Sequence, residues 1–215
     1  MKNDYLSKVF MNLFLGLLIT FLTGYIISTN IEATYFFCVG SMPWILAIIE
    51  VVIAIILPVR IQRMSPTTAK ILYFLYAGLT GLTFSSLFVY YQMSSLIWIF
   101  LMTSVMFGIF AFIGKTTKID LTRYGIYLLM GLLAVLVLAM INIFVFNEAL
   151  DMIGCTIGIV IFLGYTAYDM QRISMLNYYN LSEENMAVIG AFNLYLDFIN
   201  IFIKLLRIFG KSNDN

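Results

Sequence analysis

The sequence predicts an all-α integral membrane protein, a bundle of seven transmembrane helices. Of its 215 residues, 62% are hydrophobic and 11% are charged, whereas a soluble domain carries about 25% charged residues. Seven stretches reach the roughly 20 apolar residues that a spanning helix needs. The links between them are short, which predicts a single transmembrane domain over 1–215. We expect helices near 8–28, 35–57, 70–90, 95–113, 122–146, 150–170 and 188–209.

Each stretch has its own pattern. The first follows two lysines and is too long for the apolar core of a signal peptide, so we interpret it as a retained helix. The second contains one ionisable residue, Glu50, which we expect to face the bundle interior. Glu50 is compatible with either a cation path or a polar contact between helices. Small or polar residues recur at helical spacing in the first, third and fourth stretches, which predicts close helix packing: Asn12, Gly16, Thr20, Gly24, Gly78, Gly81, Ser85, Ser104, Gly108 and Ala111.

The distribution of basic residues predicts the orientation, because cytoplasmic links are enriched in lysine and arginine. Positive charges precede the first helix and fill the links after the second and fourth stretches, while the alternate links hold only acidic charges or none. We therefore expect a cell-membrane protein with a cytoplasmic N-terminus. Seven spans then place the C-terminus outside, although the basic residues at the end of the last stretch also leave a re-entrant last helix open.

The last stretch carries a polar stripe through an apolar helix. Asn193, Asp197, Asn200 and Lys204 follow one another at i, i+4, i+7 and i+11, so they share one helix face. An ionisable group at membrane depth usually marks a functional site, since its burial is costly. We therefore take Asp197 as a functional candidate, with Asn193 and Asn200 as candidates for an ion pathway. The alternative is a polar face that packs against neighbouring helices.

A second carboxylate, Asp169, ends the sixth stretch, which would place it near Asp197 if the two helices are antiparallel neighbours. Two carboxylates in contact share a proton and titrate as a coupled pair, which would make a proton-operated latch. Arg60, after the second stretch, would be a competing partner for either carboxylate. We expect Asp169, Asp197 and Arg60 to form the pH sensor and gate.

The segment Leu194-Tyr-Leu-Asp197-Phe-Ile-Asn200-Ile-Phe-Ile-Lys-Leu-Leu-Arg207-Ile-Phe-Gly210 closely resembles the signature of the transmembrane Bax inhibitor motif family, and in particular of its small bacterial members. The resemblance implies a seven-helix bundle with the last helix central. It also implies a pH-sensitive calcium leak channel governed by the aspartate pair, with Arg60 pairing with the aspartates in one conformation. Calcium would bind transiently to Asp169 and Asp197, as carboxylates suit a hard cation.

Other classes are less well matched. The chain has no histidine and only two cysteines, so a zinc, haem or iron–sulfur site has no ligand set, and we expect no tightly bound cofactor. A net charge of +1 argues against nucleic acid as a partner. We expect the bilayer, calcium ions and protons as partners, with protein partners unknown.

Aspartyl intramembrane proteases carry an aspartate flanked by glycines, and this chain lacks that motif, so we expect no enzyme. A non-conducting interaction protein and a calcium/proton exchanger remain open.

Overall fold

The computed structural model describes residues 2–175 and 181–213, and in this part of the chain the secondary structure is helical. Seven helices are long and apolar enough to cross a membrane, which confirms the predicted fold class. The α-helices are α1 (Lys2–Ser28), α2 (Ile31–Cys38), α3 (Met42–Arg60), α4 (Pro66–Tyr90), α5 (Met93–Thr116), α6 (Gly125–Val145), α7 (Glu148–Ser174) and α8 (Glu183–Phe209). Two short 3-10 helices, Ile61–Arg63 and Leu121–Tyr124, precede α4 and α6.

The second apolar stretch differs from the single helix expected over 35–57. The chain forms the short helix α2, turns, and begins α3 at Met42. Gly40 lies in the turn with φ +75°, a left-handed backbone conformation that residues with a side chain rarely adopt. Asn30 caps the start of α2 by accepting a hydrogen bond from the Ala33 amide. Hydrophobicity continues across this turn, so hydropathy alone could not locate the break.

The helices group into two compact units. The first contains α1–α4 and α8 as far as Tyr195, and the second contains α5–α7 and α8 from Leu196. The helix α8 thus contributes to both units, and 72% of its most apolar window is buried, against 39% or less in each other span. This burial agrees with the expectation of a central last helix, because a helix facing lipid exposes part of its surface.

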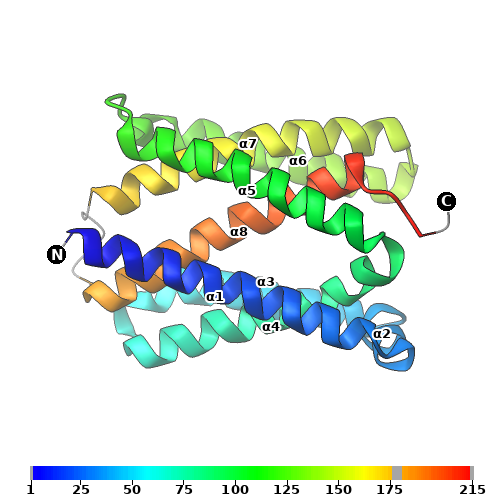
Figure 1. Ribbon diagram of the computed structural model, residues 1–215. Coiled ribbons are helices and arrows are strands. Elements are labelled where there is room, and N and C mark those ends of the chain that lie inside the picture. Colours follow the sequence, from blue (N-terminus) through cyan, green and yellow to red (C-terminus); the bar gives the residue numbers. More distant parts are fainter. Residues whose placement is uncertain (1, 176–180, 214–215) are drawn as a thin grey trace. The chain divides into compact units, whose positions relative to one another are not determined.

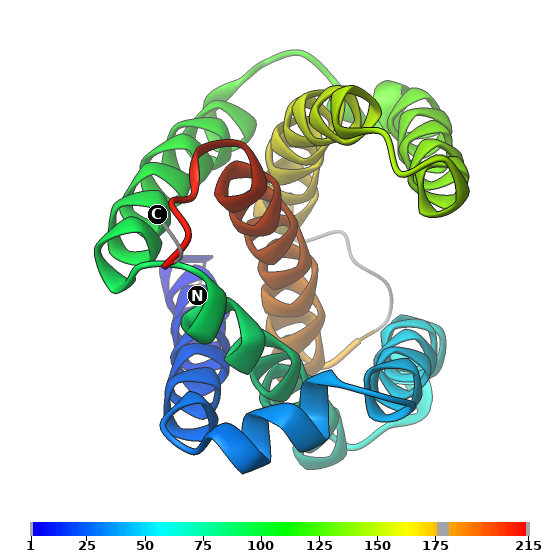
Figure 2. The same cartoon turned by 90° about the vertical axis from the view of Figure 1, so that its right-hand side faces the viewer.

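In the first unit, α1 packs along α4, as Figures 1 and 2 both show. Glycines make this approach possible: a side-chain carbon on Gly16 would overlap the Tyr73 ring, and one on Gly81 would lie 2.7 Å from the Thr20 carbonyl oxygen. The buried Tyr73 hydroxyl donates to the Asn12 carbonyl at 3.0 Å. The small-residue pattern predicted for these helices is therefore a packing feature.

In the second unit, α7 packs against both α5 and α6. Gly114 of α5 lies directly against the backbone of Ala167 in α7, where a side-chain carbon would overlap the carbonyl oxygen. Gln171 of α7 fastens the α5–α6 connection: its Nε2 donates to the Ile119 carbonyl at 2.7 Å, and its Oε1 accepts from the Leu121 amide at 2.8 Å. These contacts fix α7 at the middle of its unit.

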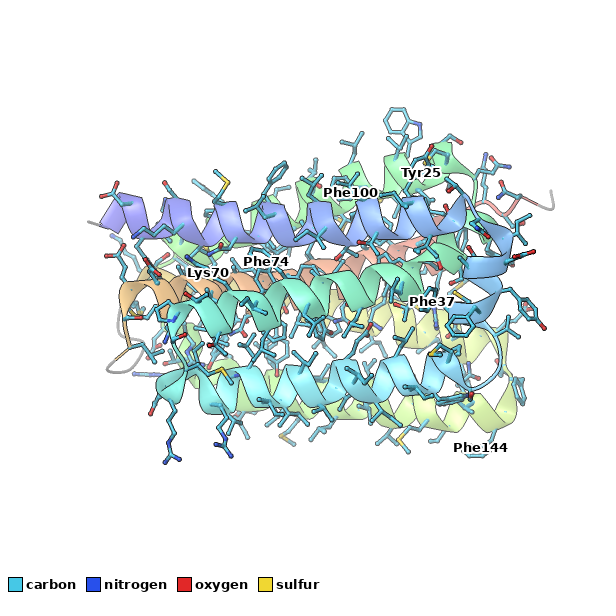
Figure 3. All side chains as sticks on the ribbon, turned by 90° about the horizontal axis from the view of Figure 1, so that it is seen from below. Tyr25, Phe37, Lys70, Phe74, Phe100 and Phe144 are labelled. Carbon is cyan, nitrogen blue, oxygen red and sulfur yellow. The ribbon has the colours of Figure 1, made fainter. Side chains whose placement is uncertain are left out.

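The faces that these contacts leave uncovered are apolar. Phe144 of α6 is 82% exposed and points away from the ribbon in Figure 3, and Trp98 of α5 is 71% exposed. Only 6% of the most apolar window of α6 is buried. Extensive apolar exposure of this kind is expected for helices whose outer surface contacts lipid tails.

The close approach of α5 and α7 predicts a position-dependent effect of adding one methyl group. Gly114→Ala should destabilise the protein by about 1–3 kcal/mol, because the Ala167 backbone must move. Gly108→Ala, on the same helix, is the matched control, since a side-chain carbon there meets nothing within 4 Å. Thermal unfolding in detergent micelles measures both variants, and equal transition temperatures would contradict the close approach.

Candidate functional site

Asp169 of α7 and Asp197 of α8 both belong to the second unit. They are 8% and 4% exposed, and their carboxylates are close enough to interact electrostatically. The side chain of Thr166, about one turn before Asp169, lies beside Asp197. One oxygen of Asp197, Oδ2, is buried and has no hydrogen-bond partner among the described residues. A buried acceptor without a partner is costly, which makes this atom a candidate to receive a proton or a cation.

The register between α7 and α8 explains why the two aspartates meet. Arg207 pairs with Asp151, the stem of Lys204 covers Gly158, and Asp197 lies near Asp169. Residue numbers fall along α8 as they rise along α7, which is the pattern of two antiparallel helices in contact. The Lys204 side chain lies over Gly158, where a side-chain carbon would lie 2.7 Å from the Lys204 Cδ.

Arg172 follows Asp169 by three residues on the same helix. Its guanidinium lies 5.4 Å from the centre of the Tyr168 ring, and its Nη1 donates to the Tyr168 hydroxyl at 3.2 Å. It also interacts electrostatically with Asp169. The aspartate pair therefore has an arginine nearby within its own unit.

The polar stripe of α8 is divided between the two units. Asn193 belongs to the first unit, whereas Asp197, Asn200, Lys204 and Arg207 belong to the second. The Asn200 amide donates to the Leu196 carbonyl of its own helix at 2.8 Å. Both asparagines are half-buried, and their role in an ion pathway stays a prediction.

Glu50 lies on α3 in the first unit and is half-buried. Its Oε1 is buried without a hydrogen-bond partner in the described part of the chain. The carboxylate interacts electrostatically with Tyr76 and Tyr195. The Tyr195 hydroxyl lies 2.6 Å from the Thr20 hydroxyl, so the surroundings of Glu50 are polar although α3 is strongly apolar.

Arg60 is the last residue of α3 and is exposed. It belongs to the first unit and the two aspartates belong to the second, so its pairing with either aspartate stays a prediction. The segment after Arg60 is held by a residue that no sequence motif indicated. The buried Asn185 of α8 donates through Nδ2 to the Ile61 carbonyl at 3.2 Å and to the Met64 carbonyl at 2.9 Å.

Each unit also has a surface pocket lined by charged residues. In the first, about 380 Å³ in volume, Lys8 and Lys70 line the pocket together with Glu184. Lys8 pairs with Glu183 at 2.8 Å and Lys70 with Glu184 at 3.6 Å; Figure 3 labels Lys70 beside the start of α8. Both ion pairs are exposed, so each contributes little stability.

The pocket of the second unit has a volume of about 360 Å³ and lies at the Arg207–Asp151 ion pair, where the two side chains are 3.0 Å apart. Glu148, the buried Cys155 and two asparagines line it with them. Cys155 and Cys38 are both free thiols. Within residues 2–175 and 181–213, no three His, Cys, Asp or Glu side chains are grouped so that they could hold a metal ion.

The position of Asn185 predicts that it stabilises the α3–α4 connection. Asn185→Ala removes the side-chain donor to both carbonyls, leaving the Ile61 carbonyl with only the 3.4 Å bond from the Met64 amide, and should destabilise the protein by about 1–3 kcal/mol. Amide hydrogen exchange should accelerate in residues 61–65. Asn193→Ala, on the same helix, removes the same amide without touching this connection. Equal exchange in residues 61–65 of both variants would show that Asn185 does not hold the segment.

Comparison with known proteins identifies the family. The family described as inhibitor of apoptosis-promoting Bax1 matches residues 2–214. A protein of Borreliella burgdorferi is 36% identical over 219 residues, covering 100% of this chain and 94% of its own length. The inner membrane protein YbhL of Escherichia coli K12 is 35% identical over 96% of this chain and 91% of its own length. A Rickettsia prowazekii protein, RP147, is 34% identical over 98% of this chain and 90% of its own length. The chain therefore belongs to the Bax1-inhibitor family of membrane proteins, as its last helix indicated.

Proposed function

We propose that this protein is a pH-sensitive calcium leak channel of the cell membrane, gated by Asp169 and Asp197. The observation that carries the proposal is the pair itself: two carboxylates from different helices, each more than nine-tenths buried, with one Asp197 oxygen lacking a hydrogen-bond partner. Intramembrane acids of this kind mark ion pathways and proton relays.

Proton binding offers a physical basis for the gate. Two neighbouring carboxylates repel each other when both are ionised, and a shared proton removes that repulsion. The contact between α7 and α8 therefore depends on how many protons the pair holds. Arg60, with its permanent charge, is the proposed alternative partner when the aspartates are ionised. A change between these partners would alter the helix contacts around the pathway.

Calcium suits this site better than a tightly bound metal does. Carboxylate oxygens are preferred ligands of hard divalent cations, and conduction requires binding that is weak enough for the ion to leave. The aspartate pair supplies two carboxylates, and Glu50 supplies another in the first unit. We propose these three acids, with Asn193 and Asn200, as the polar groups of the pathway.

The experiment measures calcium entry into liposomes that contain the purified protein and a trapped dye, from about pH 6 to pH 8. In a protein without histidine, a proton switch in this range depends on carboxylates whose pKa is perturbed. Wild-type flux should change across this range, and Asp169→Asn or Asp197→Asn should flatten the change. Glu32→Gln, an exposed carboxylate on α2, is the control and should leave the profile unchanged.

Each other outcome is informative. Calcium flux whose pH profile survives both aspartate substitutions would overturn the gate and direct attention to Glu50→Gln. Absence of flux above empty liposomes at every pH would overturn the channel and favour a non-conducting interaction protein. Counter-transport of protons with calcium would favour an exchanger instead.

A further inference from the structure

Glu50 is the acidic residue of α3, and no ion pair of the described residues includes it. Its Oε1 is buried, without a hydrogen-bond partner in the same part of the chain. Arg60, the basic residue of α3, lies ten residues further along, which is about 15 Å in the direction of the helix axis. An isolated charge is costly in an apolar environment, so a buried carboxylate needs a cation or a proton to compensate it.

The groups that face Glu50 are side chains with hydroxyls from other helices of the first unit. The carboxylate interacts electrostatically with Tyr76 of α4 and Tyr195 of α8, whose ring centres are 5.9 Å apart. Thr80 of α4 lies beside both tyrosines, and the Thr20 hydroxyl of α1 lies 2.6 Å from that of Tyr195. The two tyrosines are the titratable groups that act on Glu50, and no lysine or arginine of the described first unit does.

The hydroxyl hydrogen of Tyr195 is already committed to Thr20. Thr20 directs its own single hydroxyl hydrogen to the Ala77 carbonyl at 2.9 Å and to the Gly16 carbonyl at 3.1 Å. A threonine hydroxyl has no second hydrogen to donate. Tyr195 is therefore the donor in its 2.6 Å contact with Thr20, and its hydroxyl oxygen can only accept further hydrogen bonds.

The hydroxyl of Thr80 is committed in the same way, because it donates to the Tyr76 carbonyl of its own helix at 3.1 Å. Tyr195 and Thr80 can thus offer Glu50 lone pairs but no hydrogen, which leaves the Tyr76 hydroxyl as the possible donor. Lone pairs repel an ionised carboxylate and accept the hydrogen of a neutral carboxylic acid. Hydrogen bonds to the neutral form of an acid disfavour its ionisation, so these surroundings suit a protonated Glu50.

A metal cation fits this position less well than a proton does. Hard cations prefer several carboxylate or carbonyl oxygens, whereas Glu50 belongs to no group of three His, Cys, Asp or Glu side chains within the described residues. The nearby carbonyl oxygens of Gly16 and Ala77 already accept hydrogen bonds from Thr20. A proton needs only the acid itself and one acceptor.

We propose that Glu50 is a proton-binding site of the first unit, in addition to the aspartate pair of the second, and that the hydroxyl oxygens of Tyr195 and Thr80 stabilise its neutral form. The proton site does not require conduction. Its consequence rests on the proposed calcium leak: Glu50 would enter the pathway as a neutral acid instead of a charged ligand. Release of the proton would leave an uncompensated charge on α3, the helix that ends at Arg60.

The test is infrared spectroscopy of the purified protein in lipid bilayers at about pH 6, where a solvent-exposed glutamate is ionised. The double variant Asp169→Asn/Asp197→Asn is the background, because it removes the carbonyl bands of the two buried aspartates. In this background, Glu50→Gln should remove the carbonyl band of a buried, protonated carboxylic acid. Glu32→Gln changes an exposed glutamate of the same unit and is the matched control, which should remove no such band.

A second pair of variants tests the hydroxyl groups in the same background. Thr20→Val removes the acceptor of the Tyr195 hydrogen, which then becomes free to donate to an ionised Glu50. The pH at which half of the acid band is lost should fall by about one unit, which is a tenfold lower proton affinity. Thr103→Val, at a buried threonine of the second unit, is the control and should leave that pH unchanged. Tyr195→Phe removes the acceptor itself and should lower it as well, so an unchanged pH in both variants would overturn the role of the hydroxyls.

The remaining outcomes separate this inference from the channel proposal. Identical spectra with and without Glu50→Gln would overturn the proton site. A carboxylate band of Glu50 that shifts when calcium or potassium is added would overturn it in favour of a cation site. Calcium flux into liposomes is measured separately: an acid band without flux supports the proton site while the channel fails, and flux without an acid band overturns the proton site while the leak stands.

Discussion

The burial of two carboxylates at one contact between α7 and α8 is the constraint on which the rest of the second unit depends. Charges at membrane depth are costly unless neighbouring groups stabilise them, and Asp169 and Asp197 are both almost completely covered. The same two helices also pair through Arg207 and Asp151, and the Lys204 side chain of α8 lies over Gly158 of α7. The residues that pack these helices together therefore lie on the same faces as the buried acids.

Residues within one turn of α8 lie in two different environments. Tyr195 is held in the first unit, where its hydroxyl lies 2.6 Å from that of Thr20, and Asp197 lies near Asp169 in the second. At its start, Asn185 fastens the segment that follows Arg60. The residues of α8 before Leu196 therefore contribute hydrogen bonds to the first unit, and those from Leu196 onward contribute Asp197 to the proposed gate.

Hydropathy was sufficient to predict the helical fold, since the length of an apolar stretch determines a span. Spacing showed only that Asp169 and Asp197 would lie near each other if their helices were antiparallel neighbours. The break at Gly40 was missed because the apolar sequence runs through it. The role of Asn185 was also missed, because its partners, Ile61 and Met64, are more than 120 residues away. Such contacts depend on tertiary packing, which periodicity does not encode.

Reversible binding explains why a leak site would be built from few acids. Two buried carboxylates favour a bound divalent cation, and a leak needs binding that is readily reversed. On the polar face of α8, Asp197 is followed by the half-buried Asn200 and then by Lys204, whose stem lies against Gly158 of α7. In the proposed mechanism, the ionised aspartates attract the ion, and protonation of the pair weakens its hold.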